Sequence, residues 1–169
     1  MLSTRSMLRR ASVGAVLAAG ATFGLAGVAA AEEPDFFFPA GQACKFQLDV
    51  YVSGDFPDTR EFTDKEGNVV RTIQSGKGVA LTLINHATGA SLALPANGFT
   101  TQTTLHPDGS STVVLTGHTI LFLFPTDVPA GPSTTLHIGR VQFNVDTTGV
   151  FTVTSTSGRQ VDICAALSA

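Results

Sequence analysis

The stretch that decides the fold reads CKFQLDVYV, residues Cys44–Val52. Every second residue in it is apolar or a cysteine, and the residues between them are lysine, glutamine, aspartate and tyrosine. Successive side chains of a strand point to opposite faces of its sheet, so this alternation predicts a strand with one buried and one solvated face. The segment therefore indicates a β-protein whose first long strand opens at a cysteine.

Outside this stretch the chain repeats short apolar or threonine-rich runs. Residues 32–169 hold twenty threonines, and β-branched side chains fit pleated surfaces better than they fit helices. Turn signals rich in glycine, proline and aspartate recur at short intervals, as they do in all-β chains. The further strands predicted in this way span residues 59–63, 69–74, 79–85, 90–94, 99–106, 111–124, 134–145, 150–156 and 161–164.

Three irregularities are predicted within the later runs. Gly117 lies near the middle of the longest one and predicts a bend or a bulge. The apolar residues of 134–145 change parity after Ile138, and extra residues at Gly139–Arg140 would restore the register as a β-bulge does. Residues 157–159, Ser-Gly-Arg, predict a turn before the last segment.

The first 31 residues have the three parts of a secretory signal peptide. Three arginines precede an uncharged run of small and apolar residues that ends in Ala29-Ala30-Ala31, and cleavage is expected after Ala31 or Ala30. The run is long enough to span a membrane. Its alanine and glycine content would make insertion weak, so a retained anchor is the lesser alternative. The Arg9–Arg10 pair leaves general and twin-arginine export both open.

Removal of this segment leaves residues 32–169 as a single secreted, extracellular β domain. The 169 residues carry 10 basic and 13 acidic side chains, and the segment takes away 31 residues with three arginines and no acid. The remaining 138 residues therefore have a net charge of −6 and are enough to bury a core. Nucleic acid and anionic lipid bind clustered lysine and arginine, so neither is expected as a partner. No membrane span is expected after cleavage.

The sequence holds two cysteines, Cys44 and Cys164. In an exported protein an even cysteine count predicts a bridge, whereas free thiols would suit the cytosol. A bridge over nearly the whole domain would stabilise it by roughly 4 to 5 kcal/mol. Bridged residues have Cα atoms within about 7 Å, so the two ends of the domain are expected side by side.

Short connections predict that most successive strands pair as antiparallel neighbours. A meander whose ends meet is either a closed barrel or a two-sheet sandwich. The expected fold is an all-β antiparallel meander of about eight to ten strands, closed as a barrel or barrel-like sandwich and carrying one disulfide. A barrel or a barrel-like sandwich is preferred because hairpins leave little room for Greek-key crossovers.

The candidates for chemistry are four histidines, His86, His106, His118 and His137. No two of them lie within four residues, and neither a nucleophile elbow nor a free cysteine is present. No catalytic residue, metal or cofactor is therefore expected. His118 and His137 lie within predicted strands and could meet across a sheet. A serine or carboxylate beside either one would make a small extracellular hydrolase, which is the alternative function.

Two apolar features remain after the histidines. Phe36–Pro39 (FFFP) is expected to plug one end of the core, and Ile120–Phe124 (ILFLF) to be a central strand with both faces covered. A sharper interpretation is an interior that holds a small apolar ligand. The candidate binding residues are then Phe122, Phe124, Phe143 and His118.

Three stretches carry a resemblance: His106–Ser110 (HPDGS), Leu121–Pro125 (LFLFP) and Gly158–Leu167 (GRQVDICAAL). Together they resemble small uncharacterised secreted β-domain proteins of actinobacterial type. The resemblance implies secretion and a β fold, and it transfers no functional residue.

The expected function is that of a secreted, non-enzymatic β domain. It would bind a small apolar ligand or act as a surface interaction module, for example with a component of the cell envelope. The ligand version predicts a cavity of roughly a few hundred Å³ between the sheets. The interaction version predicts an exposed apolar patch.

Overall fold

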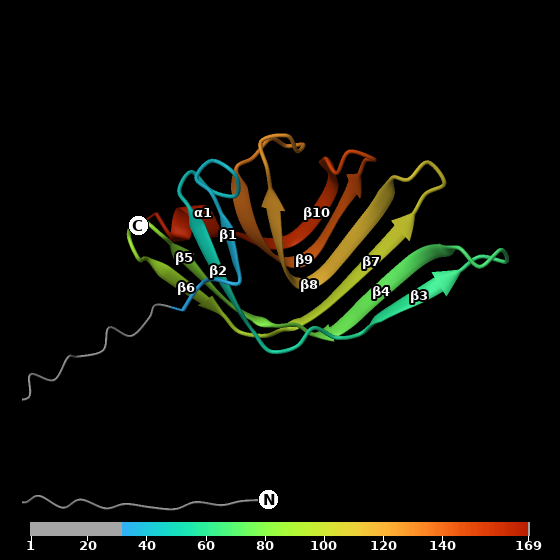
Figure 1. Ribbon diagram of the computed structural model, residues 1–169, viewed down its shortest axis with the longest axis horizontal. Coiled ribbons are helices and arrows are strands. Elements are labelled where there is room, and N and C mark those ends of the chain that lie inside the picture. Colours follow the sequence, from blue (N-terminus) through green and yellow to red (C-terminus); the bar gives the residue numbers. More distant parts are fainter. Residues whose placement is uncertain (1–31, 169) are drawn as a thin grey trace, which may run out of the picture. The chain divides into compact units, whose positions relative to one another are not determined.

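Two antiparallel sheets make up the protein in the computed structural model, which describes residues 32–168 (Figure 1). The predicted signal peptide, residues 1–31, lies outside the described residues. The chain from Glu33 on forms one compact unit. The predicted all-β class and the predicted number of strands are confirmed.

The ten strands divide unequally between the sheets. The smaller sheet has the order β1 (Phe36–Phe38), β2 (Leu48–Ser53), β5 (Ala80–Asn85) and β6 (Ser91–Leu94). The larger sheet has the order β10 (Phe151–Asp162), β9 (Ser133–Val145), β8 (Ser111–Leu123), β7 (Gly98–Leu105), β4 (Val69–Lys77) and β3 (Thr59–Thr63). The helix α1 (Ile163–Ala166) follows β10.

Neither sheet closes on itself, so the predicted closed barrel is wrong. The chain leaves the smaller sheet after β2, builds β3 and β4 in the larger one, and returns for β5 and β6. As a result β2 pairs with β5 and β4 pairs with β7, which breaks the meander twice. The hairpins β3–β4 and β5–β6 agree with the predicted strands and turns. The sheet that each hairpin joins is decided by long-range pairing. The two-sheet alternative therefore describes the fold better.

The larger sheet bends along a row of three glycines, and this line of bending is called the crease. Gly117 of β8 lies opposite Gly139 of β9, which lies opposite Gly158 of β10. Their φ angles are 97°, 150° and 91°, and glycines of this kind let strands bend. A Cβ on Gly117 would stand 2.3 Å from the carbonyl oxygen of Gly98. β8, β9 and β10 are each strongly curved (Figure 1). Of the bend or bulge predicted at Gly117, the positive φ and the unshifted β8–β9 register fit a bend.

The bulge predicted at Gly139–Arg140 is wrong. The β8–β9 register runs without a shift from Ser111 opposite Val145 to Leu123 opposite Ser133. The parity change arises because β9 buries different faces on the two sides of the crease. Leu136 packs on the core under the smaller sheet, whereas Val141 lies inside the crease. The register shift of this region lies in β10, between Val153 and Ser155.

The ends of the domain also differ from expectation. Cys44 precedes β2 instead of opening it, and the predicted turn at residues 157–159 is continuous strand within β10. Gly158 there belongs to the crease, where a positive φ bends a strand without ending it. The predicted last strand, 161–164, ends at Asp162, whose carboxylate caps α1 by accepting the N–H of Ala165 at 2.9 Å.

The two halves of the larger sheet on either side of the glycine row are the arms of the crease. They enclose a core of their own, built from Val113, Leu115, Leu121, Leu123, Val141 and Phe143. The loop after β8 holds the arms together, because Val128 forms an isolated parallel bridge with Thr152 of β10. Asp127 is 3% exposed and accepts the N–H groups of Phe124 at 2.6 Å and Phe151 at 2.9 Å. One buried carboxylate thus joins the end of β8 to the start of β10.

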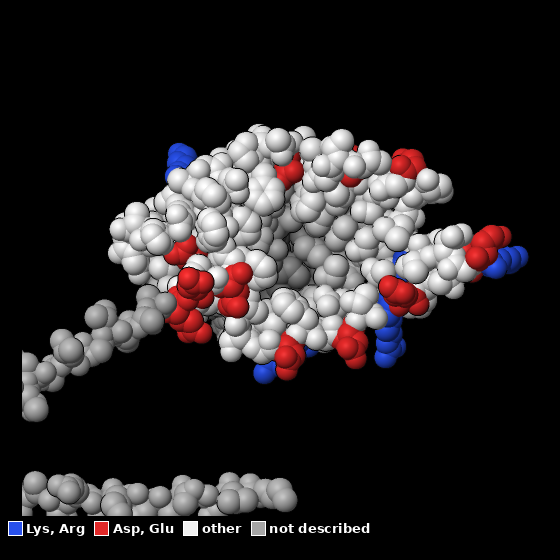
Figure 2. All heavy atoms as spheres, viewed as in Figure 1, with Lys and Arg blue, Asp and Glu red and all other residues white. Residues whose placement is uncertain are grey.

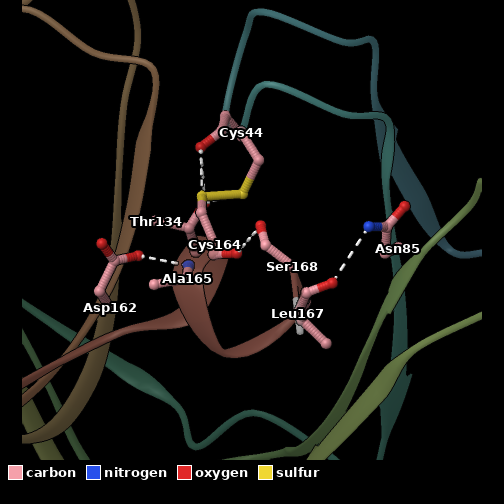
Figure 3. Close-up of a disulfide and its surroundings, with 9 residues drawn as sticks. Cys44, Asn85, Thr134, Asp162, Cys164, Ala165, Leu167 and Ser168 are labelled. Atoms are coloured by element: carbon pink, nitrogen blue, oxygen red, sulfur yellow. Dashed lines mark hydrogen bonds between the residues drawn. A yellow bond between two sulfur atoms is a disulfide. The ribbon is translucent and has the colours of Figure 1, made fainter. Parts of the chain in front are cut away.

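The main core lies under the smaller sheet and includes Leu48, Leu83 and Ile163, all fully buried. The predicted Cys44–Cys164 disulfide is confirmed, with 5.6 Å between the Cα atoms (Figure 3). Thr134 donates its hydroxyl to the Ala43 carbonyl at 3.0 Å, which ties β9 to the loop that carries Cys44. Ile120 and Phe122 pack against this core while Leu121 and Leu123 face the crease, so both faces of this segment are covered, as predicted.

Candidate ligand cavity

A cavity of about 470 Å³ lies between the smaller sheet and the middle of the larger one. This volume lies within the usual range for sites that bind small molecules. Figure 2 shows a hollow near the middle of one face, with uncoloured atoms at its floor. The packing of the two sheets thus leaves a space large enough for a small molecule.

The wall is mostly apolar and rich in phenylalanine. Phe38 of β1 stacks on Phe122 of β8 with ring centroids 4.8 Å apart. Phe36 and Phe56 also line the cavity, although 59% and 60% of their surfaces are exposed. Because these rings both line the cavity and reach solvent, they can contact an apolar molecule as it enters.

Few polar groups interrupt this wall. Gln74 donates one amide N–H to the Pro57 carbonyl and Asn97 donates one to the Pro95 carbonyl, each at 2.9 Å. His118 is the one titratable residue among the lining residues that the structure describes. Polar contributions to binding must therefore come from a very small set of side chains.

The strand that carries His118 has an open edge beside the cavity. β7 pairs with β8 only as far as Gly117, and beyond it the described part of β8 pairs with β9 alone. The lining includes both His118 and Thr119, which point to opposite faces of the strand. The cavity therefore reaches this edge, where alternate main-chain N–H and C=O groups point away from β9.

The structure brings two of the four predicted binding residues into the cavity, Phe122 and His118. Phe124 lies beside Phe38, at 6.0 Å between centroids, but does not line the space. Phe143 packs inside the crease, stacked on Phe151 at 4.8 Å. Its place differs because the crease turns that half of β9 away from the smaller sheet.

Sequence reasoning missed the contribution of the N-terminal phenylalanines. Phe36–Phe38 form the edge strand β1, which pairs with β2, instead of a plug. Phe36 and Phe38 line the cavity, and Phe37 between them is 61% exposed. An alternating side-chain pattern over three identical residues leaves no signal in the sequence.

His118 and His137 do not meet across the sheet. His118 lies opposite Ile138 and His137 opposite Thr119, so the two imidazoles lie on opposite faces. Among the described residues, neither ring hydrogen-bonds a serine or a carboxylate. The geometry that the hydrolase alternative requires is not assembled in the described part of the chain.

His137 is 4% exposed, and its Nδ1 has no partner among the described residues. Burial lowers the pKa of His137 below its ordinary value of 6.5. Below pH 6.5 the unfolded chain therefore binds a proton that the folded protein does not, and folding loses stability until the pH reaches the folded pKa.

We accordingly expect the urea midpoint of unfolding to decrease as the pH is lowered from 7.5 to 5.5. The fall should be smaller in His137→Leu, because that variant lacks the titrating group. His106→Leu, which removes an exposed imidazole, should keep the full dependence. An unchanged dependence in His137→Leu would show that His137 titrates normally in the folded protein.

A second imidazole hydrogen-bonds a carboxylate at the start of β2. Nδ1 of His86 lies 2.6 Å from Oδ2 of Asp49, whose other oxygen accepts the amide of Gln47 at 2.9 Å. The burial of Asp49 acts to raise its pKa, but hydrogen bonds from Gln47 and His86 and the attraction of His86 lower the pKa below 3.8. His86 is 61% exposed, and no described serine or cysteine hydrogen-bonds it. The pair orients a turn instead of completing a catalytic set.

The described residues include neither a candidate metal site nor a candidate membrane-spanning helix. They include no group of three or more histidine, cysteine, aspartate or glutamate side chains placed to hold a metal ion. Their helical content does not include a segment with the length and apolar character of a membrane span. Comparison with protein-family models, curated proteins and solved structures finds no match to this chain.

Proposed function

We propose that this protein binds a small apolar molecule in the cavity between its two sheets and that it does so outside the cytoplasm. The observation that carries the proposal is the cavity of about 470 Å³ with a phenylalanine-rich wall. Burial of apolar surface drives such binding, at about 25 cal/mol for each Å² removed from water. A wall that already exists lowers the cost of ordering the site.

The extracellular location is supported by the disulfide and by the residues that precede the described part of the chain. Cys44 and Cys164 are oxidised, and bridges of this kind persist in oxidising compartments. The three-part pattern of residues 1–31 is that of a signal peptide. N-terminal sequencing of the protein from culture medium should begin at Glu32 or Ala31.

The binding role is favoured over the hydrolase alternative by the surroundings of the histidines. His118 has apolar neighbours in the cavity, and His137 is buried on the other face of β8–β9. A surface interaction module is the other version, supported by the exposed rings of Phe36, Phe37 and Phe56. The cavity favours the ligand version because Phe36 and Phe56 belong to its wall.

Binding can be tested with N-phenyl-1-naphthylamine, a neutral apolar dye that fluoresces in apolar surroundings. We expect saturable fluorescence with the mature protein. Val52→Trp should weaken dye binding at least tenfold, because Val52 lines the cavity and a larger ring there occupies its volume.

Val70→Trp is the matched control, since Val70 is a strand valine that is 37% exposed and does not line the cavity. This variant should bind the dye like the wild type, and circular dichroism should be the same for all three proteins. Absence of saturable dye binding to the wild type, or equal binding by Val52→Trp, would contradict the proposed function. Native mass spectrometry of protein from culture medium would then identify any retained molecule.

A further inference from the structure

We infer that the ligand is an amphiphile, an apolar chain with a single carboxylate, and that His118 binds the carboxylate. This inference rests on the proposed function and specifies the class of molecule that the cavity takes. The carrying observation is that an otherwise apolar wall holds one titratable residue, on the open edge of β8.

The cavity offers hydrogen-bond donors but no charged acceptor. Nothing in the described structure hydrogen-bonds the His118 ring, and the amides of Gln74 and Asn97 already donate to main-chain carbonyls. A ring N–H left without a partner beneath an apolar ligand would lose its water at a cost of about 1 to 3 kcal/mol. A pure hydrocarbon would incur that cost, whereas a ligand with an accepting head group avoids it.

A further feature beside His118 favours a hydrogen-bonding ligand. The open edge of β8 begins at this residue, and an edge strand there points main-chain groups away from its partner. The His118 ring and these main-chain groups thus lie together at one end of this segment.

The apolar features continue in the other direction along the strand. From His118 the same face of β8 presents Ile120 and Phe122, and Phe122 stacks on Phe38. At about 3.3 Å per residue, the four steps from His118 to Phe122 span roughly 13 Å. A head group at His118 therefore leaves an apolar wall of about that length for the chain.

No second charged residue lines the cavity. The parts of β1, β2, β4, β5, β7 and β9 that line it contribute no aspartate, glutamate, lysine or arginine. The residue opposite His118 on β9 is Ile138, and the residue opposite Ile138 on β10 is Arg159, which does not line the cavity. A carboxylate would therefore meet no acidic lining residue, and the imidazolium form of His118 would bind it most strongly.

The test measures displacement of N-phenyl-1-naphthylamine by dodecanoic acid and by dodecanol, which share the same chain and differ in the head group. At pH 6 we expect the acid to bind the wild type at least tenfold more tightly than the alcohol. His118→Leu should reduce acid affinity about tenfold and leave dye and alcohol affinity within twofold. His118→Gln keeps a hydrogen-bond donor without charge and should fall between the two.

His106→Leu is the matched control, because it removes an exposed histidine that bonds Thr112 and does not line the cavity. It should bind the acid like the wild type. Equal binding of acid and alcohol, or acid binding that is unchanged in both His118 variants, would overturn the carboxylate assignment while dye binding still supports an apolar site. Loss of dye binding in the wild type would instead refute the proposed function itself.

Discussion

Removing the disulfide with Cys44→Ala/Cys164→Ala is expected to lower the free energy of unfolding by about 5 kcal/mol. The two cysteines are 120 residues apart, and closing so long a loop restricts the unfolded chain strongly. The effect is large against the total stability of a single domain, typically about 5 to 15 kcal/mol. We expect the double variant to have a much lower urea midpoint and a partly unfolded population at 37 °C.

Reduced wild-type protein is the control for this measurement. Cys44 is fully buried, so part of the loss in the double variant comes from packing around the shortened side chain. Reduction with dithiothreitol keeps both side chains and removes only the bond. The reduced protein and the double variant should each have a free energy of unfolding several kcal/mol below that of the oxidised protein. A double variant as stable as the oxidised protein would contradict the structural role of the bridge.

The second large effect is expected for Gly117→Ala, which should lower the free energy of unfolding by about 3 to 5 kcal/mol. A positive φ costs a non-glycine residue about 1 to 3 kcal/mol. The added Cβ would also stand 2.3 Å from the Gly98 carbonyl oxygen and 3.0 Å from the Cα of Phe99. Both neighbours are backbone, so relief of the contact requires β7 to move away from β8, at a further cost of about 1 to 3 kcal/mol.

Gly149→Ala is the matched control for this substitution. Gly149 has a φ of 87°, close to that of Gly117, but a Cβ there would meet nothing within 4 Å. Its replacement should therefore cost only the backbone term, about 1 to 2 kcal/mol. Urea unfolding of the two variants separates the clash from the φ penalty. Equal losses would mean that the glycine row does not set the close approach of the strands.

Element positions were largely predictable from the sequence because strands and turns leave local signals. The strand predicted at residues 59–63 matches β3, and those at 111–124 and 134–145 match β8 and β9 to within one residue. Predicted boundaries are wrong where a local signal has two meanings. A glycine between two apolar runs reads as a turn, yet Gly158 lies within a continuous strand because its neighbour across the sheet is Gly139.

The candidate cavity was only half predictable. Phe122 and His118 were anticipated because they lie in the strongest apolar run and in a strand. Phe143 looks equivalent in the sequence but lies on the other side of the crease. The open edge of β8 left no signal, because it depends on the register that places Phe99, at the start of β7, opposite Gly117.

The sequence by itself determined the β class, the pairing of the two cysteines and the bend at Gly117, because each follows from alternation, from a count of two or from one residue's backbone freedom. Only the tertiary structure decided which sheet receives each hairpin, where the larger sheet folds, and which phenylalanines face the cavity. These depend on contacts between residues far apart in the chain. Such contacts are selected by the free energy of burying whole faces together, and no local pattern encodes that choice.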